Sequence, residues 1–178
     1  MQYLAEVFHE SFSEFLKRER DNILNGVAER NLCARWSLYM QKAAGRYGLR
    51  GYFADADYNR KQAGRVKTII DDQMREIVIV CDLILHSRGN NVAKDNLIAV
   101  EMKKAERPRA EKDADRVRLR AMTKASYDDI WSNDGITPPE HVCGYKLGFF
   151  VEIDSRRSKY VVEVYEQGKQ TDQFAGDI

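Results

Sequence analysis

Cysteine is scarce in this sequence and is not arranged as a cross-linking or zinc-binding set. Cys33, Cys81 and Cys143 are the three cysteines, and no Cys-x-x-Cys motif or cysteine–histidine cluster joins them. A dispersed, odd-numbered set argues against a disulfide framework and against a structural zinc site. We therefore expect free, buried thiols in a reducing compartment.

Proline and flexible linkers are equally scarce. The three prolines all lie outside the strongest apolar segments, and the chain shows no internal repeat, low-complexity segment or linker rich in glycine and serine. A chain of 178 residues suits one domain that buries its own core. The expected organisation is a single domain over 1–178, with an N-terminal helix at 1–20, a core at 22–165 and a tail at 166–178.

No stretch of the sequence is apolar over the length that a membrane helix needs. The first residues carry acidic side chains early and lack the basic start and apolar run of a secretory signal. These absences favour a cytoplasmic protein with no membrane partner. The formal net charge is +1, so total charge neither indicates nor excludes a nucleic-acid partner, and only a local basic patch could do so.

Periodic apolar residues mark the secondary structure that is present. Helical spacing predicts helices at 3–20 and 22–46. The segment 76–86, rich in Ile and Val, is typical of a strand buried on both faces, and a polar turn joins it to a second strand at 96–102 in an antiparallel hairpin. The other expected elements are a short strand at 51–58, a helix at 111–125 and strands at 145–153 and 160–165. This order predicts an α/β fold, with a mixed central β-sheet between helices in a three-layer sandwich.

Three charged residues lie inside or at the end of these apolar strands. Asp82 interrupts the first strand of the hairpin, and Glu101 and Lys103 lie at the end of the second. Side chains alternate faces along a strand, so Glu101 and Lys103 share one face, and Asp82 reaches that face if the hairpin pairs as expected. A buried charge is costly unless it is paired or binds a metal.

Two carboxylates and a lysine on one face fit the hydrolysis of phosphodiesters. Asp82 and Glu101 offer the hard oxygen ligands that Mg²⁺ prefers, with Mn²⁺ as a substitute. The metal would stabilise charge on the phosphodiester and help to generate hydroxide from bound water, while Lys103 would orient that water or stabilise the developing charge. The alternative is a simple salt bridge between Glu101 and Lys103, because Glu-x-Lys occurs by chance on the order of once in a chain of this length.

The segments around these residues resemble the PD-(D/E)xK, or restriction-endonuclease-like, superfamily. They are CDLILHSRG at 81–89 and NLIAVEMKK at 96–104, preceded by AERNLCARWSLYM at 28–40 and DADYNR at 55–60, and followed by KDADRVRLRAM at 112–122. The order of elements over about residues 20 to 165 is similar to the αβββαβ core of that superfamily. The resemblance implies a restriction-endonuclease-like fold, divalent-metal dependence and a phosphodiester substrate. One departure is that Cys81 holds the position of the usual proline, which many members lack.

The resemblance also implies a further carboxylate in the catalytic and metal-binding set. Members of the superfamily often supply one from the first core helix, and Glu29 matches that position. The alternative is a solvated helix residue that pairs with a neighbouring arginine. In the same way, Asp57 and Arg60 match a segment that lies near the active site in the superfamily. The resemblance implies that Asp57 is a metal ligand and that Arg60 contacts phosphate. The alternative is that Asp57 caps a turn.

Several basic residues near the catalytic strands are candidate nucleic-acid contacts. His86 shares the face of Asp82 along the strand, although a hydrogen bond to the loop would also explain it. The segment 103–124 carries nine Lys or Arg against four Asp or Glu. It could follow a phosphate backbone, although a solvated helix face gives the same pattern. The candidate contacts are His86, Arg88, Arg60, Lys104, Arg116 and Arg120.

The sequence thus favours a Mg²⁺-dependent nuclease that hydrolyses phosphodiester bonds, with DNA preferred over RNA. One alternative is a catalytically inactive nucleic-acid-binding or assembly subunit on the same fold. Another is a structural protein in which the charged residues form a buried ion network. A homodimer, or a place as a subunit in a larger complex, stays open because the sequence shows no diagnostic interface.

Overall fold

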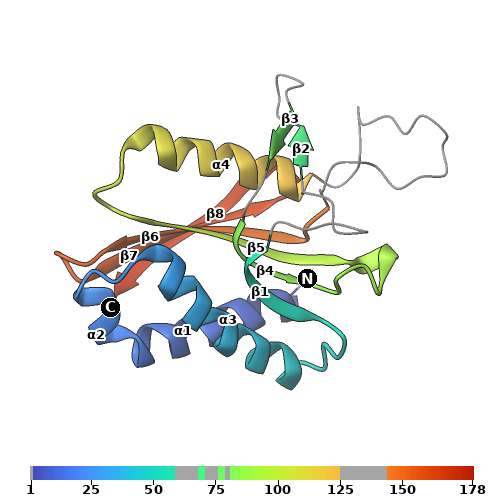
Figure 1. Cartoon of the computed structure of the whole chain (residues 1–178), viewed down its shortest axis with the longest axis horizontal. Helices are drawn as coiled ribbons and strands as arrows, with labels where there is room; N and C mark the ends of the chain where they lie inside the picture. Colours follow the sequence, from blue (N-terminus) through green and yellow to red (C-terminus); the bar gives the residue numbers. More distant parts are fainter. Residues whose placement is uncertain (1, 59–67, 71–75, 79–80, 125–143) are drawn as a thin grey trace.

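Helices lie on both faces of a central sheet, so the described part of the chain forms three layers (Figure 1). The computed structural model describes residues 2–58, 68–70, 76–78, 81–124 and 144–178. Three helices cover one face, and the fourth crosses the other. None of the helices in these ranges has the length and hydropathy to span a membrane. The helices are α1 (Gln2–Arg18), α2 (Arg20–Leu24), α3 (Glu29–Arg46) and α4 (Arg109–Thr123).

The central sheet has six strands in the order β1–β4–β5–β6–β7–β8. Neighbouring strands are antiparallel except for β5 and β6, which run parallel with α4 between them in the sequence. A separate antiparallel pair, β2 and β3, lies beside α4. The strands are β1 (Phe53–Tyr58), β2 (Thr68–Ile70), β3 (Glu76–Val78), β4 (Cys81–His86), β5 (Asn96–Lys104), β6 (Leu147–Asp154), β7 (Lys159–Glu166) and β8 (Lys169–Asp177). The predicted α/β class, the mixed sheet and the antiparallel hairpin are confirmed.

The core lies on both faces of β5. On the face of α1 and α3, Phe8, Phe15 and Trp36 are fully buried, and Trp36 Nε1 donates a hydrogen bond to Ser11 Oγ at 3.1 Å. On the face of α4, a second cluster includes Leu119. Burial of one large apolar side chain contributes about 1.5–3 kcal/mol, so both layers are held firmly against the sheet. Charged residues on β5 therefore lie in surroundings that solvate them poorly.

The cysteines that can be described follow the prediction. Cys33 and Cys81 are buried free thiols. Burial raises the pKa of both thiols well above its usual value, which keeps them protonated and unreactive. Cys143 lies outside the described residues.

The predicted helix over 22–46 is wrong as a single element. The structure has two helices, α2 and α3, with a turn between them. Gly26 in that turn adopts a left-handed backbone, with φ +73°, which a helix cannot continue through. The apolar residues kept their helical spacing across this turn by coincidence, so periodicity missed the break.

Two further predictions differ from the structure along the strands. The segment 76–86 is divided between β3, which pairs with β2, and β4 in the central sheet. The predicted tail at 166–178 instead contains β8, which pairs antiparallel with β7. The sequence of β8 is polar and its side chains are mostly exposed, so it lacks the apolar alternation that marks a strand in a sequence. Backbone pairing with β7, and not burial of side chains, specifies it.

Candidate active site

Pairing between β4 and β5 brings the predicted charged residues together. Leu83 pairs with Val100, so Asp82 and Glu101 come next to one another along the two antiparallel strands. Met102 points to the layer of α1 and α3, where Cys33 Sγ lies 3.9 Å from its sulfur. Glu101, on the opposite face of β5, therefore points towards α4, as alternation along the strand requires.

Asp82 and Glu101 form a buried pair of carboxyl groups. Leu83 pairs with Val100, which sets the two side chains opposite one another, and Asp82 Oδ2 accepts the backbone N–H of Met102 at 2.8 Å. Glu101 is completely buried. Burial raises the pKa of both carboxyls, and the charge of Asp82 raises the pKa of Glu101 further, well above its usual value. Both carboxyls therefore hold a proton more readily than an exposed carboxyl does.

Lys103 lies beside this pair as a cation. Its Nζ is 3.7 Å from Asp82 Oδ2 and 2.8 Å from Asp115 Oδ2. Burial alone would lower the pKa of Lys103, but Asp82 and Asp115 outweigh that effect and hold the pKa above its usual value. The amine is therefore protonated at neutral pH, which suits it to stabilise negative charge and not to remove a proton.

Helix α4 adds two residues that the sequence reasoning did not assign to the site. Arg118 Nη1 lies 2.7 Å from Glu101 Oε1 and 3.0 Å from Asp115 Oδ1. Asp115 is itself almost completely buried. The spacing Asp115-x-x-Arg118 places both on one helix face and was the available signal. It was hidden because the segment had been interpreted as a basic surface.

Three atoms of this network are buried without a hydrogen-bond partner among the described residues: Glu101 Oε2, Asp115 Oδ2 and Arg118 Nε. Asp115 Oδ2 still has an ionic partner in Lys103, so the acceptor Glu101 Oε2 and the donor Arg118 Nε are the two without any partner. An unpartnered buried polar group costs about 1–3 kcal/mol. Such groups in a folded protein call for an explanation, and a ligand or catalytic role is one of the common ones.

The carboxyl pair fits part of the coordination sphere of Mg²⁺. This ion is usually held through one or two carboxylates and keeps waters or substrate oxygens at its other positions. Asp82 and Glu101 supply two carboxylates, and Glu101 Oε2 is an open ligand atom. Within the described ranges, however, no group of three or more His, Cys, Asp or Glu side chains is placed to hold a metal ion. The residues therefore suit a two-carboxylate site and not a cage built from protein ligands alone.

Glu29, the fourth predicted member, has different partners. It is the first residue of α3, and its Oε1 accepts the backbone N–H of Lys104 at 2.8 Å. Arg107 Nε lies 3.8 Å from the same oxygen. These contacts tie α3 to the end of β5, and the predicted metal role of Glu29 stays a prediction.

The residues of the β1–β4 end form a separate cluster. Asp55 Oδ2 lies 2.9 Å from His86 Nε2, and the guanidinium of Arg88 binds both carboxylate oxygens of Asp55. Asp57 is paired with Arg30 of α3. His86 and Arg88 are thus engaged with a protein carboxylate, and Arg60 lies outside the described residues.

Of the other predicted nucleic-acid contacts, Lys104 ends β5, and Arg116 and Arg120 lie one turn apart on α4. Lys104 Nζ donates to the carbonyl of Gly26, in the turn between α2 and α3. Arg116 binds Glu163 of β7 through two nitrogens, and Arg120 lies over the ring of Tyr165, 5.9 Å from its centroid. Each of these three residues has a partner within the protein, and their predicted contact with nucleic acid stays a prediction.

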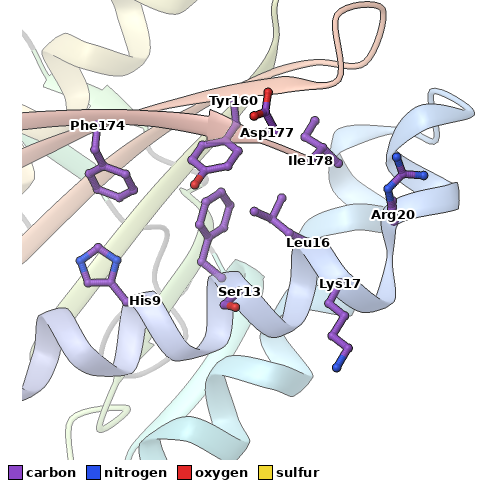
Figure 2. Close-up of a pocket in the computed structure, with 10 residues that line it drawn as sticks. His9, Ser13, Leu16, Lys17, Arg20, Tyr160, Phe174, Asp177 and Ile178 are labelled. Atoms are coloured by element: carbon purple, nitrogen blue, oxygen red, sulfur yellow. The ribbon is translucent and has the colours of Figure 1, made fainter.

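A cavity of about 520 Å³ lies apart from the candidate active site, between α1 and the strands β7 and β8 (Figure 2). Phe12, Leu16 and Phe174 give it an apolar lining, and Lys17 and Arg20 lie at one end. None of the candidate catalytic residues lines it. It is on the α1 face of the sheet, opposite α4, and so is not part of the candidate site.

Comparison with known proteins adds no relative. No family model matches the chain, and no curated protein and no solved structure matches it.

Proposed function

We propose that this protein is a divalent-metal-dependent nuclease, with Asp82 and Glu101 as ligands of Mg²⁺ and Lys103 as the cation beside the phosphate. The proposal includes a restriction-endonuclease-like core. The described order α3, β1, β4, β5, α4, β6 supports it, with Asp82 on β4 and Glu101 and Lys103 on β5. We favour DNA over RNA as the substrate, and the resemblance itself does not imply which nucleic acid is cut.

The observation that carries the proposal is a buried oxygen of the carboxyl pair that receives no hydrogen bond. A purely structural ion network gains most when every buried lone pair and N–H is satisfied. Here Glu101 Oε2 has no donor among the described residues although Glu101 is fully buried. A bound divalent cation would satisfy this oxygen.

The roles of the protein groups follow from their contacts. When bound, the metal would act as a Lewis acid on the phosphodiester. Asp82 is fixed by the backbone N–H of Met102, so its carboxylate is held in one orientation. Lys103 is fixed by Asp115 and stays protonated, so it stabilises the charge that develops on the phosphoryl oxygens. Preorganised charges of this kind act strongly because they need no rearrangement during the reaction.

The test is cleavage of single- and double-stranded DNA and RNA with Mg²⁺ or Mn²⁺ and with EDTA. Glu101→Gln keeps the shape of the side chain and removes the charge, and we expect it to abolish metal-dependent cleavage. The matched control is Glu152→Gln, because Glu152 pairs with Lys103 in the β5–β6 register but binds Lys112 with its carboxylate. Full activity in Glu101→Gln, or cleavage that persists in EDTA, would exclude the proposal.

A catalytically inactive structural or assembly role is the second candidate, and the pair Arg118–Glu101 favours it. A carboxylate that is already bound to a guanidinium at 2.7 Å has a protein counterion. In that case Mn²⁺ should not bind, and Glu101→Gln combined with Arg118→Met should be better tolerated than either change alone. Calorimetry with Mn²⁺ and a double-mutant cycle of unfolding free energies separate this role from the nuclease.

A further inference from the structure

Arg118 is the protein cation bound to Glu101, the carboxylate that the proposed metal would also bind. Its Nη1 bridges Glu101 Oε1 and Asp115 Oδ1, at 2.7 and 3.0 Å. The guanidinium reaches Glu101 from α4, the helix that crosses this face of the sheet. Yet its Nε is buried without an acceptor among the described residues, so the guanidinium is held here with one of its donors unsatisfied.

We propose that Arg118 is an internal counterion that competes with the divalent cation for Glu101, so that the metal binds only when Arg118 releases this carboxylate. This inference rests on the proposed metal site but concerns a different step. In this arrangement, the contact between α4 and Glu101 controls whether the metal can bind.

The charge of the network supports an exchange and not a simple addition. Three carboxylates (Asp82, Glu101, Asp115) surround two cations (Lys103, Arg118). With all groups ionised, the network has one excess negative charge. A divalent ion added beside Arg118 would leave one excess positive charge, whereas exchange of Arg118 for that ion leaves none. Because net charge is costly in a buried site, exchange is the favoured route.

Arg118 is partly exposed, so its guanidinium can move into water. The side chain of Arg118 is 21% exposed, as is that of Asp82, while Glu101 has no exposed surface. Arginine has a long, flexible stem, so its charged end can move to water while the stem stays packed on the helix face.

The experiment is calorimetric titration of the full chain with MnCl2. In Arg118→Met, which keeps the bulk of the side chain without its charge, we expect Mn²⁺ to bind at least about tenfold more tightly, within the usual range of coupling between competing ligands. The matched control is Arg116→Met on the same helix, because Arg116 binds Glu163 and not the carboxyl pair. It should leave the affinity unchanged. Equal or weaker binding in Arg118→Met overturns the inference.

A second measurement needs no loss of charge and so avoids a variant that fails to fold. The Nε–H resonance of Arg118 can be assigned in the wild type by comparison with Arg118→Lys. Saturation with diamagnetic Mg²⁺ should shift this resonance and speed its exchange with water, because the guanidinium leaves a buried position. A resonance that stays unchanged while Mg²⁺ binds overturns the inference, as does the absence of metal binding.

The inference and the proposed function fail in different ways. Tighter Mn²⁺ binding in Arg118→Met without cleavage of any nucleic acid would support the competition and reject the nuclease. Metal-dependent cleavage with an unchanged Mn²⁺ affinity in Arg118→Met would support the nuclease and reject the competition.

Discussion

Lys103 Nζ lies 2.8 Å from Asp115 Oδ2, so the lysine of the Glu-x-Lys motif is bound to helix α4. Glu101, two residues earlier, is likewise bound to α4, through Arg118. The sequence left open a salt bridge between Glu101 and Lys103 themselves, and the structure instead gives each its own partner on the helix. The candidate site is therefore made by the packing of α4 on β5, and not by the strand alone.

Replacement of Lys103 should separate catalysis from metal binding. In Lys103→Met we expect cleavage to fall by about 100-fold or more, because a fixed positive charge beside the phosphate is lost. The affinity for Mn²⁺ should not weaken, since the lysine is not a ligand. Single-turnover cleavage and calorimetry measure the two quantities.

The control for this variant is Lys112→Met, which removes another half-buried lysine of the same region, bound to Glu152. It should keep wild-type cleavage. A Lys103→Met protein that retains most of its activity contradicts the role assigned to this amine.

Glu29 offers a test of whether the site extends to α3. Its Oε1 accepts the Lys104 N–H, and glutamine can accept the same bond. We expect Glu29→Gln to keep the Mn²⁺ affinity within about twofold, and Glu29→Ala to lower the unfolding free energy by about 1 kcal/mol through the lost hydrogen bond. A large loss of Mn²⁺ affinity in Glu29→Gln would instead establish Glu29 as a ligand, as the sequence predicts.

Stability at acidic pH should depend on Asp55. Burial alone would raise its pKa, but the hydrogen bonds from Arg88 and His86 outweigh burial and hold the pKa below its usual value. A carboxyl with a lowered pKa stabilises the fold above its unfolded-state pKa of about 3.9, and this contribution is lost as pH falls through the lower folded-state pKa. Asp55→Asn should therefore be about 1–3 kcal/mol less stable than wild type at pH 7.

The difference between Asp55→Asn and wild type should shrink as pH falls below about 4, where the unfolded chain binds a proton at Asp55 before the folded protein does. Urea unfolding at several pH values measures it. Asp177→Asn is the control, because its pair with Lys159 is exposed and should contribute little at any pH. A difference that does not depend on pH would show that shape, and not charge, makes Asp55 important.

The contact between α4 and β6 depends on a glycine. A Cβ on Gly148 would lie 2.8 Å from Thr123 Cγ2 and 3.3 Å from Leu119 Cδ2, both on α4. Gly148→Ala should therefore cost about 1–3 kcal/mol through overpacking. It should also lower cleavage, since α4 carries Asp115 and Arg118. Thermal unfolding and the cleavage assay report the two effects.

Gly45→Ala is the matched control for Gly148→Ala. A Cβ at Gly45 in α3 meets no atom within 4 Å, and alanine favours a helix over glycine by about 0.5–1 kcal/mol. We expect this variant to be slightly more stable and fully active. Equal stability of Gly148→Ala and wild type would show that α4 shifts freely on the sheet.

The secondary structure that the sequence predicted best was the part with strong apolar periodicity. The hairpin of β4 and β5 and the placement of Glu101 and Lys103 on one face followed from alternation along a strand. The predictions of secondary structure were wrong where the local sequence pattern does not specify the element. Gly26 ended a helix inside an apolar repeat, and β8 formed from a polar sequence because β7 offered an edge to pair with.

The sequence by itself determined which residues of β5 point to the same side, because this depends only on the geometry of an extended chain. It also determined that Asp82 and Glu101 would be costly to bury without partners. Only the tertiary structure decided who those partners are. Asp115 and Arg118 reach the site through packing of α4 on the sheet, at 14 and 17 residues from Glu101 along the chain. Such contacts form when a whole helix packs on a sheet. The spacing of residues within one segment does not predict them.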